Sequence, residues 1–268
     1  MYKFLVFLLI VPALFANVDT DMDGVDDIVD QCPGTLITDL VDIKGCGIES
    51  LVSPHHYDII VGASYSQMNS NSNAKTDTYT KSLSADYYYK NYSAQISTSH
   101  STSKSASLND NGLGDTTLAA GYIFNIQPNL SGRVGAGIVL PTYKSTLNNN
   151  NTDYIASLNL TYTMDKINLF AGYNFTMTND DDIPNTVVYQ NAHGMSAGVG
   201  YSVNEKLYVN GSYSRADSTS KNTEDTESIS MMGSYSLDQH WFTSASYAYG
   251  LSDSTSDHYL SANLGYRF

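Results

Sequence analysis

From Tyr57 to the end of the chain, apolar and polar side chains alternate with a period of two, in segments of roughly ten residues. In the last segment one face carries Leu260, Ala262, Leu264, Tyr266 and Phe268, and the other carries Ser261, Asn263, Gly265 and Arg267. Successive side chains of a β-strand point to opposite faces. Each segment is therefore expected to be a strand with one apolar and one polar face.

The apolar faces need a partner, which is either a second sheet or lipid. A soluble sandwich would bury them against a second sheet, whereas a transmembrane barrel turns them to lipid and leaves the polar faces around its lumen. Twelve such segments follow one another, at residues 59–66, 83–89, 92–97, 117–125, 130–140, 156–162, 169–175, 195–201, 207–213, 229–237, 245–249 and 259–268. This even number favours an all-β fold, a 12-stranded antiparallel transmembrane β-barrel over residues 51–268.

The connections between the segments are alternately short and long. The short links are 90–91, 126–128, 165–166, 204–205 and 238–239; the long links, rich in Ser, Asn, Asp and Thr, are 67–78, 100–113, 142–153, 178–192, 216–226 and 251–257. Short periplasmic turns facing long external loops are typical of Gram-negative outer-membrane barrels. The sequence thus predicts the cell outer membrane, with both ends of the barrel on the periplasmic side.

Tyrosine is unusually frequent, with 22 residues against a single Trp. Amphipathic aromatic rings suit the boundary between membrane and water. The candidates for such girdles, in contact with outer-membrane lipid, are Tyr87, Tyr89, Tyr173, Tyr201 and Tyr249.

Residues 1–16 have the layout of a secretory signal peptide, in which a cationic start at Lys3 precedes an apolar run and Ala16. Cleavage is expected after Ala16, and the alternative is an uncleaved anchor helix. Export makes it reasonable that the two cysteines, Cys32 and Cys46, form one intramolecular disulfide.

Residues 17–50 are strongly acidic and carry much of the chain's net charge of −14, so nucleic acid is not expected as a partner. Asp19, Asp21 and Asp23 alternate, Val25 could bind by its carbonyl, and Asp27 and Asp30 follow at the ninth and twelfth positions of the possible loop. Calcium takes six to eight oxygen ligands, and a turn at Gly24 would wrap these carboxylates around one cation. A solvated acidic linker is the alternative.

The run DTDMDGVDDIVDQC followed by Pro33, with VDIKGCG around Cys46, resembles a thrombospondin type 3 repeat. The resemblance implies Ca2+ on the five aspartates and a bond between Cys32 and Cys46. A small N-terminal calcium-binding, disulfide-closed segment in the periplasm is therefore expected over residues 17–50.

Two further resemblances concern the barrel. The alternating Leu264, Tyr266 and Phe268 resemble the C-terminal signature of outer-membrane barrels, which implies recognition by the barrel assembly machinery. The stretches GLGDTTLAAGYIF and GIVLPT, within residues 112–142, resemble the outer-membrane transporter family linked to the meta-pathway of phenol degradation; Tyr143 stands where that family usually has Gly. This resemblance implies uptake or efflux of small molecules such as aromatic compounds. Considered without the resemblance, Gly112, Gly114 and Asp115 are residues typical of a turn at the start of a strand.

The polar faces consist mostly of Ser, Gly, Asn and Thr, and their clear charges are Asp58, Asp86, Arg133 and Arg267. Small side chains leave space in a barrel of this size, which favours a narrow channel for a small solute. The arginines are expected to pair with the aspartates across the lumen, either to hold the barrel together or to set its selectivity.

Two other functions fit an outer-membrane barrel. One is a structural or adhesive role, and the other is a hydrolase that uses, for example, His193 beside Ser196. No motif couples these two residues, so the chain is not expected to be an enzyme.

Overall fold

The computed structural model describes residues 19, 21, 25–35, 41–47, 53–69, 75–106, 109–143, 150–184 and 186–268. The chain divides into two compact units, Met1–Ser53 and Pro54–Phe268, each of which is considered by itself. The predicted signal peptide at 1–16, Asp23 and Gly24 lie outside the described residues. No helix in the described ranges has the length and apolar character needed to cross a membrane.

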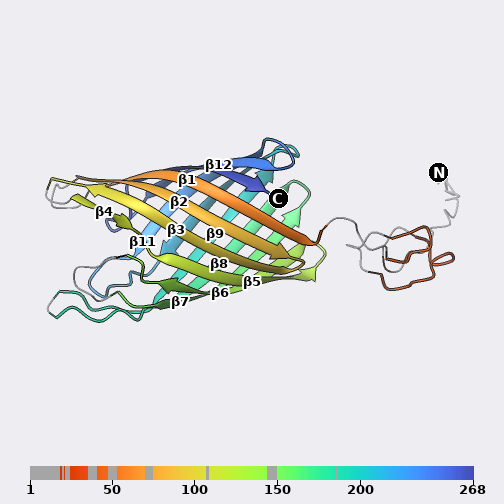
Figure 1. The fold of residues 1–268 in the computed structure, drawn as a ribbon, viewed down its shortest axis with the longest axis horizontal. Helices are drawn as coiled ribbons and strands as arrows, with labels where there is room; N and C mark the ends of the chain where they lie inside the picture. Colours follow the sequence, from red (N-terminus) through yellow and green to blue (C-terminus); the bar gives the residue numbers. More distant parts are fainter. Residues whose placement is uncertain are drawn as a thin grey trace, which may run out of the picture. The chain divides into compact units, whose positions relative to one another are not determined.

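The larger unit is a closed barrel of tilted antiparallel strands (Figure 1). Its strands are β1 (His55–Asn69), β2 (Lys75–Tyr89), β3 (Tyr92–Lys104), β4 (Asn109–Leu113), β5 (Thr116–Gln127), β6 (Leu130–Leu140), β7 (Asp153–Met164), β8 (Ile167–Met177), β9 (Ala192–Ser202), β10 (Leu207–Ala216), β11 (Thr226–Ser236), β12 (Trp241–Gly250) and β13 (His258–Arg267). Consecutive strands are neighbours except for β4 and β5, which both pair with β3, and β13 pairs with β1 to close the sheet.

The thirteen strands of the described residues occupy twelve positions around the barrel, because β4 and β5 share one. The first half of β3 pairs with β5, and its second half pairs with β4. The break lies at Gly114, whose amide donates a 2.8 Å hydrogen bond to the carbonyl of Ser99. The predicted 12-stranded antiparallel barrel is confirmed.

Two of the predicted long loops are shorter than expected. The link placed at 67–78 shrinks to 70–74, and the link at 100–113 contains the end of β3 and all of β4. Hydroxyl side chains pair across these polar extensions, as in Thr78 with Ser103 and Thr80 with Ser101, both at 2.9 Å. Cross-strand hydrogen bonds of this kind extend strands without apolar residues.

The short links form tight turns at one end of the barrel, called the turn end; the opposite end, with the longer links, is the loop end. Lys90 and Asp165 adopt left-handed backbone angles, with φ of 50° and 52°. Two-residue hairpins require such angles to match the twist of the strands. The turns at 90–91 and 165–166 thus lie where the sequence placed them.

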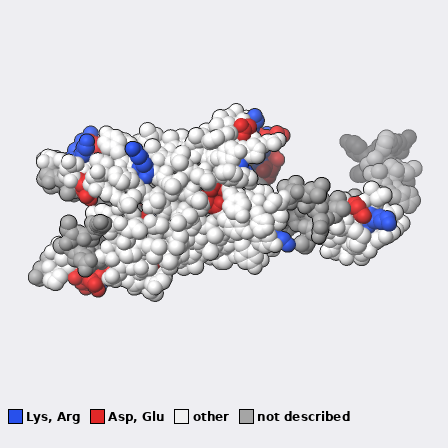
Figure 2. All heavy atoms as spheres, in the orientation of Figure 1, with Lys and Arg blue, Asp and Glu red and all other residues white. Residues whose placement is uncertain are grey.

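The apolar faces of the strands point outward. Val61, Leu83 and Met231 are 51%, 50% and 71% exposed, and in the described residues the only buried hydrophobic residue is Ala192. The buried polar residues are Asp58, Asp86, Ser93 and Ser261. Figure 2 shows uncharged side chains over most of the visible wall of the barrel, with charged ones mainly toward its ends. This inverted pattern is the one that a lipid-embedded barrel requires.

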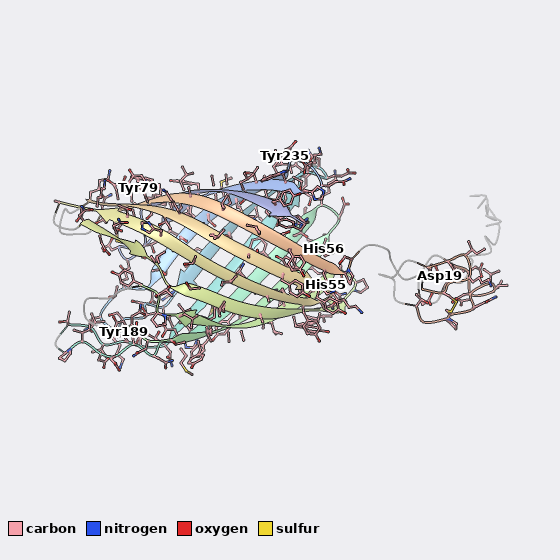
Figure 3. All side chains as sticks on the ribbon, in the orientation of Figure 1. Asp19, His55, His56, Tyr79, Tyr189 and Tyr235 are labelled. Carbon is pink, nitrogen blue, oxygen red and sulfur yellow. A yellow bond between two sulfur atoms is a disulfide. The ribbon has the colours of Figure 1, made fainter. Side chains whose placement is uncertain are left out.

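Aromatic residues gather at both ends of the outer wall. Tyr235 and His55 lie at the turn end and Tyr79 at the loop end (Figure 3). At the turn end His55 stacks on the predicted girdle residues Tyr87 and Tyr89. Two aromatic bands separated by an apolar wall match the two interfaces of a membrane.

The three residues of the predicted assembly signal line the turn end of β13. Leu264 and Phe268 are 40% and 61% exposed, and the ring of Tyr266 contacts that of Phe268 at 4.7 Å between centroids. The amide of Phe268 donates a 2.9 Å hydrogen bond to the carbonyl of Tyr57 on β1. These residues therefore lie where the first and last strands close the barrel.

Candidate functional site

The lumen carries an ion pair between the first and last strands. The guanidinium of Arg267 donates two hydrogen bonds to the carboxylate of Asp58, from Nε to Oδ1 at 3.0 Å and from Nη2 to Oδ2 at 3.1 Å. Asp58 is only 4% exposed, whereas the Arg267 side chain is 54% exposed. These residues face each other in the β1–β13 register, so the pair links adjacent strands and does not cross the lumen.

The other two predicted lumen charges bind neutral partners. Asp86 accepts a 2.6 Å hydrogen bond from Gln95, and Arg133 donates one of 2.9 Å to Ser93. The Arg133 guanidinium lies over Gly121, where a Cβ would come within 2.7 Å of it. Within the described part of the chain Arg133 forms no salt bridge.

Tyr88 is a lumen residue that the sequence reasoning missed. It lies between two outward-facing tyrosines, opposite His56 in the β1–β2 register. Its hydroxyl interacts electrostatically with all four lumen charges, Asp58, Asp86, Arg133 and Arg267. Because Tyr87, Tyr88 and Tyr89 are consecutive, residue type does not separate the two faces here. Only the position of Tyr88, two residues after Asp86, assigns it to the polar face.

The charges gather on one side of the lumen, on β13, β1, β2 and β6. Across from them, the inward faces of β7–β12 carry Asn, Ser, Gly and aromatic side chains; of the described inward residues there, Asp153 at the loop-end edge is the one that is charged. The lumen thus has a charged wall and an uncharged wall.

Glycines let inward-facing aromatic rings lie flat against the wall. The Phe170 ring covers Gly198, and the Phe242 ring covers Gly265, so a Cβ at either glycine would collide with the ring. Arg267 lies 5.4 Å from the centroid of the Phe242 ring. Flat rings narrow the lumen less than rings that project toward its axis.

The two halves of the transporter-like motif meet at the loop end. Thr142 Oγ1 donates a 2.7 Å hydrogen bond to the carbonyl of Gly114, and the amide of Tyr143 donates one of 3.0 Å to Asp115. The Tyr143 hydroxyl also donates to Asp110 at 3.1 Å, which raises the pKa of that tyrosine. The motif therefore fixes the junction of β4, β5 and β6.

His193 and Ser196, the residues of the hydrolase alternative, lie on opposite faces of β9. On the outer wall, His193 Nδ1 and the Tyr173 hydroxyl share a hydrogen bond of 2.7 Å. Ser196 faces the lumen beside Gly172. Positions three apart in a strand point in opposite directions, so these side chains do not form a catalytic pair.

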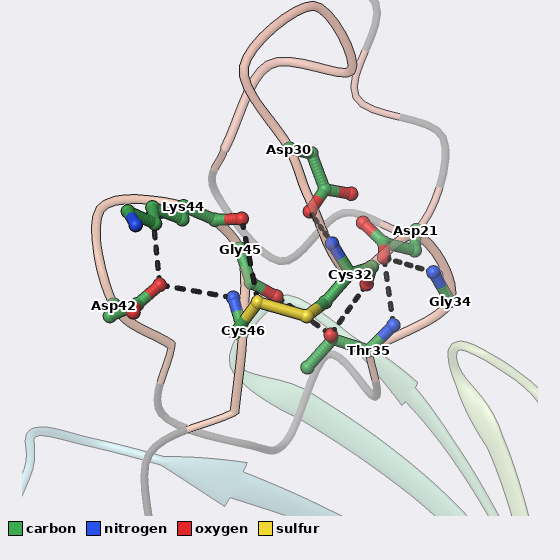
Figure 4. The surroundings of a disulfide bond; sticks show 9 residues. All are labelled: Asp21, Asp30, Cys32, Gly34, Thr35, Asp42, Lys44, Gly45 and Cys46. Carbon is green, nitrogen blue, oxygen red and sulfur yellow. Dashed lines mark hydrogen bonds between the residues drawn. A yellow bond between two sulfur atoms is a disulfide. The ribbon is translucent and has the colours of Figure 1, made fainter.

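In the N-terminal unit a disulfide joins Cys32 to Cys46, as predicted (Figure 4). Polar contacts surround it. Asp21 Oδ2 accepts hydrogen bonds from the amides of Gly34 and Thr35 at 2.6 and 2.8 Å, and Asp30 Oδ1 accepts one from the Cys32 amide at 2.8 Å. These carboxylates thus organise the backbone around the disulfide.

The remaining carboxylate oxygens suit a hard cation. Asp30 Oδ2 is buried and has no hydrogen-bond partner in the described residues, and the Oδ1 atoms of Asp19 and Asp21 are likewise withdrawn from solvent. Asp27 is exposed in a turn, and Val25 is half-buried. No three ligating side chains converge among the described residues, which do not include Asp23. The donor set is nevertheless all oxygen, as calcium requires.

Similarity to known proteins agrees with this architecture. The crystal structure of the COG4313 outer-membrane channel from Pseudomonas putida F1 matches with a TM-score of 0.70 and 12% identity, over 81% of this chain and 97% of that one. The NanC porin matches with 0.55 and 14%, over 79% and 98%. The translocator domain of the autotransporter NalP from Neisseria meningitidis matches with 0.50 and 11%, over 82% and 90%. At such identities the likeness establishes the fold alone.

The comparison with curated proteins found no match. A family model does match, and it covers residues 47–268, which include the whole barrel. Gly114 and Thr142, from the two stretches that resemble this family, meet at the junction of β4, β5 and β6. The chain is an outer-membrane β-barrel that belongs to the family described as the putative MetA-pathway of phenol degradation.

Proposed function

We propose that the barrel is a channel for small solutes across the outer membrane. The observation that carries this proposal is the solvent-accessible polar inner wall. Asn159 on β7 and Asn174 on β8 face inward and are nevertheless solvent-exposed. A barrel closed by packed side chains would bury such residues. The fold shared with a known outer-membrane channel supports the same conclusion.

The charge balance of the lumen favours uncharged solutes. In the turn-end half of the lumen the charges are two aspartates and two arginines, and the ion pair between Asp58 and Arg267 neutralises one of each. A stretch of lumen without an excess of either sign exerts little selection between anions and cations. In this proposal the turn end and the N-terminal unit face the periplasm, because short turns do so in outer-membrane barrels.

Swelling of protein-containing liposomes in isotonic sugars tests the channel. We expect swelling in arabinose and glucose and none in a large dextran, because a narrow lumen excludes the polymer. Gly172→Trp places a ring inside the lumen and should slow swelling. Gly211→Trp, on the outward face where a Cβ meets only a carbonyl at 3.8 Å, is the matched control and should swell normally.

Liposomes that do not swell in any sugar, although the protein is folded, would refute the channel and favour a structural or adhesive role. Lipid hydrolysis in the same vesicles would instead favour the enzyme alternative. The separated positions of His193 and Ser196 argue against that outcome.

We also propose that the N-terminal unit binds one Ca2+ through Asp19, Asp21, Asp23, Asp27 and Asp30, with the Val25 carbonyl as a backbone ligand. The buried, unsatisfied Oδ2 of Asp30 supports this proposal, since a buried carboxylate oxygen without a partner is costly. The cation would neutralise clustered carboxylates that otherwise repel one another.

Isothermal titration with calcium chloride tests this site. We expect one site, with binding lost or strongly weakened in Asp30→Asn. Asp42→Asn is the control, because Asp42 accepts hydrogen bonds from the amides of Lys44 and Cys46 and is not a proposed ligand. If calcium binding releases the same heat in Asp30→Asn, in Asp42→Asn and in the unmodified protein, the proposal is contradicted.

A further inference from the structure

The uncharged wall of the lumen contains a recess of about 480 Å³. It is lined chiefly by Asn159, Asn168, Phe170, Ser196, Tyr208 and Asn210, which come from β7, β8, β9 and β10. All six alternate with outward-facing apolar residues, so the recess opens into the barrel and not toward lipid.

The polar groups of this recess are largely unused by the protein. The side chains of Asn159, Asn210 and Ser196 and the Tyr208 hydroxyl make no hydrogen bond to any described residue. Serines elsewhere in the lumen behave differently, as in the pair Ser212–Ser230 at 2.8 Å. Amides and hydroxyls without protein partners are available to water or to a ligand.

Glycines shape the recess. A Cβ at Gly172 would lie 2.8 Å from both Asn159 Oδ1 and Ser196 Oγ, so these two polar atoms lean toward the same glycine from opposite strands. The Phe170 ring lies over Gly198, and the Tyr208 ring lies over Gly200. Two ring faces and a group of amides and hydroxyls therefore share one wall.

This combination fits a ligand that has several hydroxyl groups, an apolar ring face and no charge. A sugar presents its C–H groups to an aromatic face and its hydroxyls to amides, which both donate and accept hydrogen bonds. A simple phenol has one hydroxyl and would leave most of the polar groups unpaired. A charged solute would find no counter-ion there, because the lining of the recess is uncharged and the four charges of the turn-end half lie on the other wall.

We propose that this recess is a binding site for neutral saccharides on their way through the barrel. Phe170 and Tyr208 act as stacking platforms, and Asn159, Asn210 and Ser196 bind the sugar hydroxyls. The inference rests on the proposed channel function and names its solute class.

Single-channel recording with maltotriose as the probe tests the recess. We expect brief, concentration-dependent current blockades, and in Phe170→Ala a dissociation constant that rises roughly three- to tenfold, the effect of one aromatic contact. Asn159→Ala combined with Asn210→Ala should weaken binding by at least as much. Phe175→Ala, which changes an outward ring of β8, and Asn174→Ala, an inward residue outside the recess, should leave the blockades unchanged.

Blockades of equal strength by a polyethylene glycol of the same size would overturn the proposal, since such a polymer lacks the hydroxyls. So would unchanged blockades in the recess variants. A folded barrel is expected to run differently on a denaturing gel before and after boiling. A variant that fails to fold shows no such difference, and the remaining recess variant then decides. If the folded protein conducts no ions, the channel proposal fails separately, and titration calorimetry with maltotriose in detergent decides the recess.

Discussion

Replacing Arg267 by Met is expected to destabilise the barrel because it leaves the carboxylate of Asp58 buried without its partner. Asp58 is 4% exposed and faces Asp86 directly across the β1–β2 register. In the described structure its carboxylate accepts hydrogen bonds from Arg267 alone. The substitution thus removes two charge-assisted hydrogen bonds and leaves two carboxylates side by side.

The size of the effect follows from the uneven burial of the pair. Breaking a fully buried pair costs about 3–5 kcal/mol, whereas exposed pairs contribute about 0–1 kcal/mol. The Asp58 side chain is 6% exposed, but that of Arg267 is 54% exposed, so water screens one half of the pair. We therefore expect Arg267→Met to lower the free energy of unfolding by about 1–3 kcal/mol. Asp58→Asn should cost less, because the exposed guanidinium is easily hydrated.

The assay is urea unfolding of the detergent-refolded protein, followed by the fluorescence of the single tryptophan. That residue, Trp241, contacts Tyr266 at 4.8 Å between ring centroids, beside the altered position. The double variant Asp58→Asn, Arg267→Met should recover at least half of the loss, since residue 58 then carries no charge that is left unpaired beside Asp86. A double variant that is no more stable than Arg267→Met would refute the reasoning.

Three other predictions concern separate parts of the chain. Gly265→Ala should lower the free energy of unfolding by about 1–3 kcal/mol in the same assay, because its Cβ would collide with the Phe242 ring; unchanged stability would show that the ring moves freely. Reduction of the disulfide should destabilise the N-terminal unit by about 3 kcal/mol and increase its proteolysis, with no change in the gel mobility of the barrel; a barrel that also unfolds would contradict this. Arg215 lowers the pKa of Asp225 by a 2.9 Å hydrogen bond, so this contact stabilises its loop above roughly pH 4 and is lost as the pH falls through the lowered pKa. In Arg215→Gln, carbon-13 NMR should show the pKa of Asp225 rising toward its usual value, and an unchanged titration curve would refute the prediction.

The sequence predicted the barrel well because alternation is a property of each strand by itself. A period of two fixes which residues face lipid, and in the twelve predicted segments the outward set is mainly apolar, as Val61 and Leu83 illustrate. The tight turns were equally predictable, since Lys90 and Asp165 fall between two complete alternating segments.

The polar extensions of the strands could not be predicted in the same way. Residues 100–104 and 109–113 contain mostly hydroxyl, amide and charged side chains, which are equally frequent in loops. Their β-structure depends on pairing with neighbouring strands, as between Thr102 and Asn111 at 3.1 Å, and pairing is not visible in one segment alone.

The lumen was predicted in composition but not in arrangement. Alternation placed Asp58, Asp86, Arg133 and Arg267 inside, yet their partners depend on the register between strands. The same register brings Phe170 onto Gly198 and creates the uncharged recess, which no local motif indicates.

The barrel is expected to conduct small solutes through a lumen whose turn-end half has balanced charge. Single-channel recording of the refolded protein in a planar bilayer, under a tenfold gradient of potassium chloride, tests it most directly. The structure predicts small, steady conductance steps and a reversal potential near zero, because two aspartates and two arginines balance in the turn-end half of the lumen. The absence of conductance, or a reversal potential shifted strongly toward that of one ion, would contradict it.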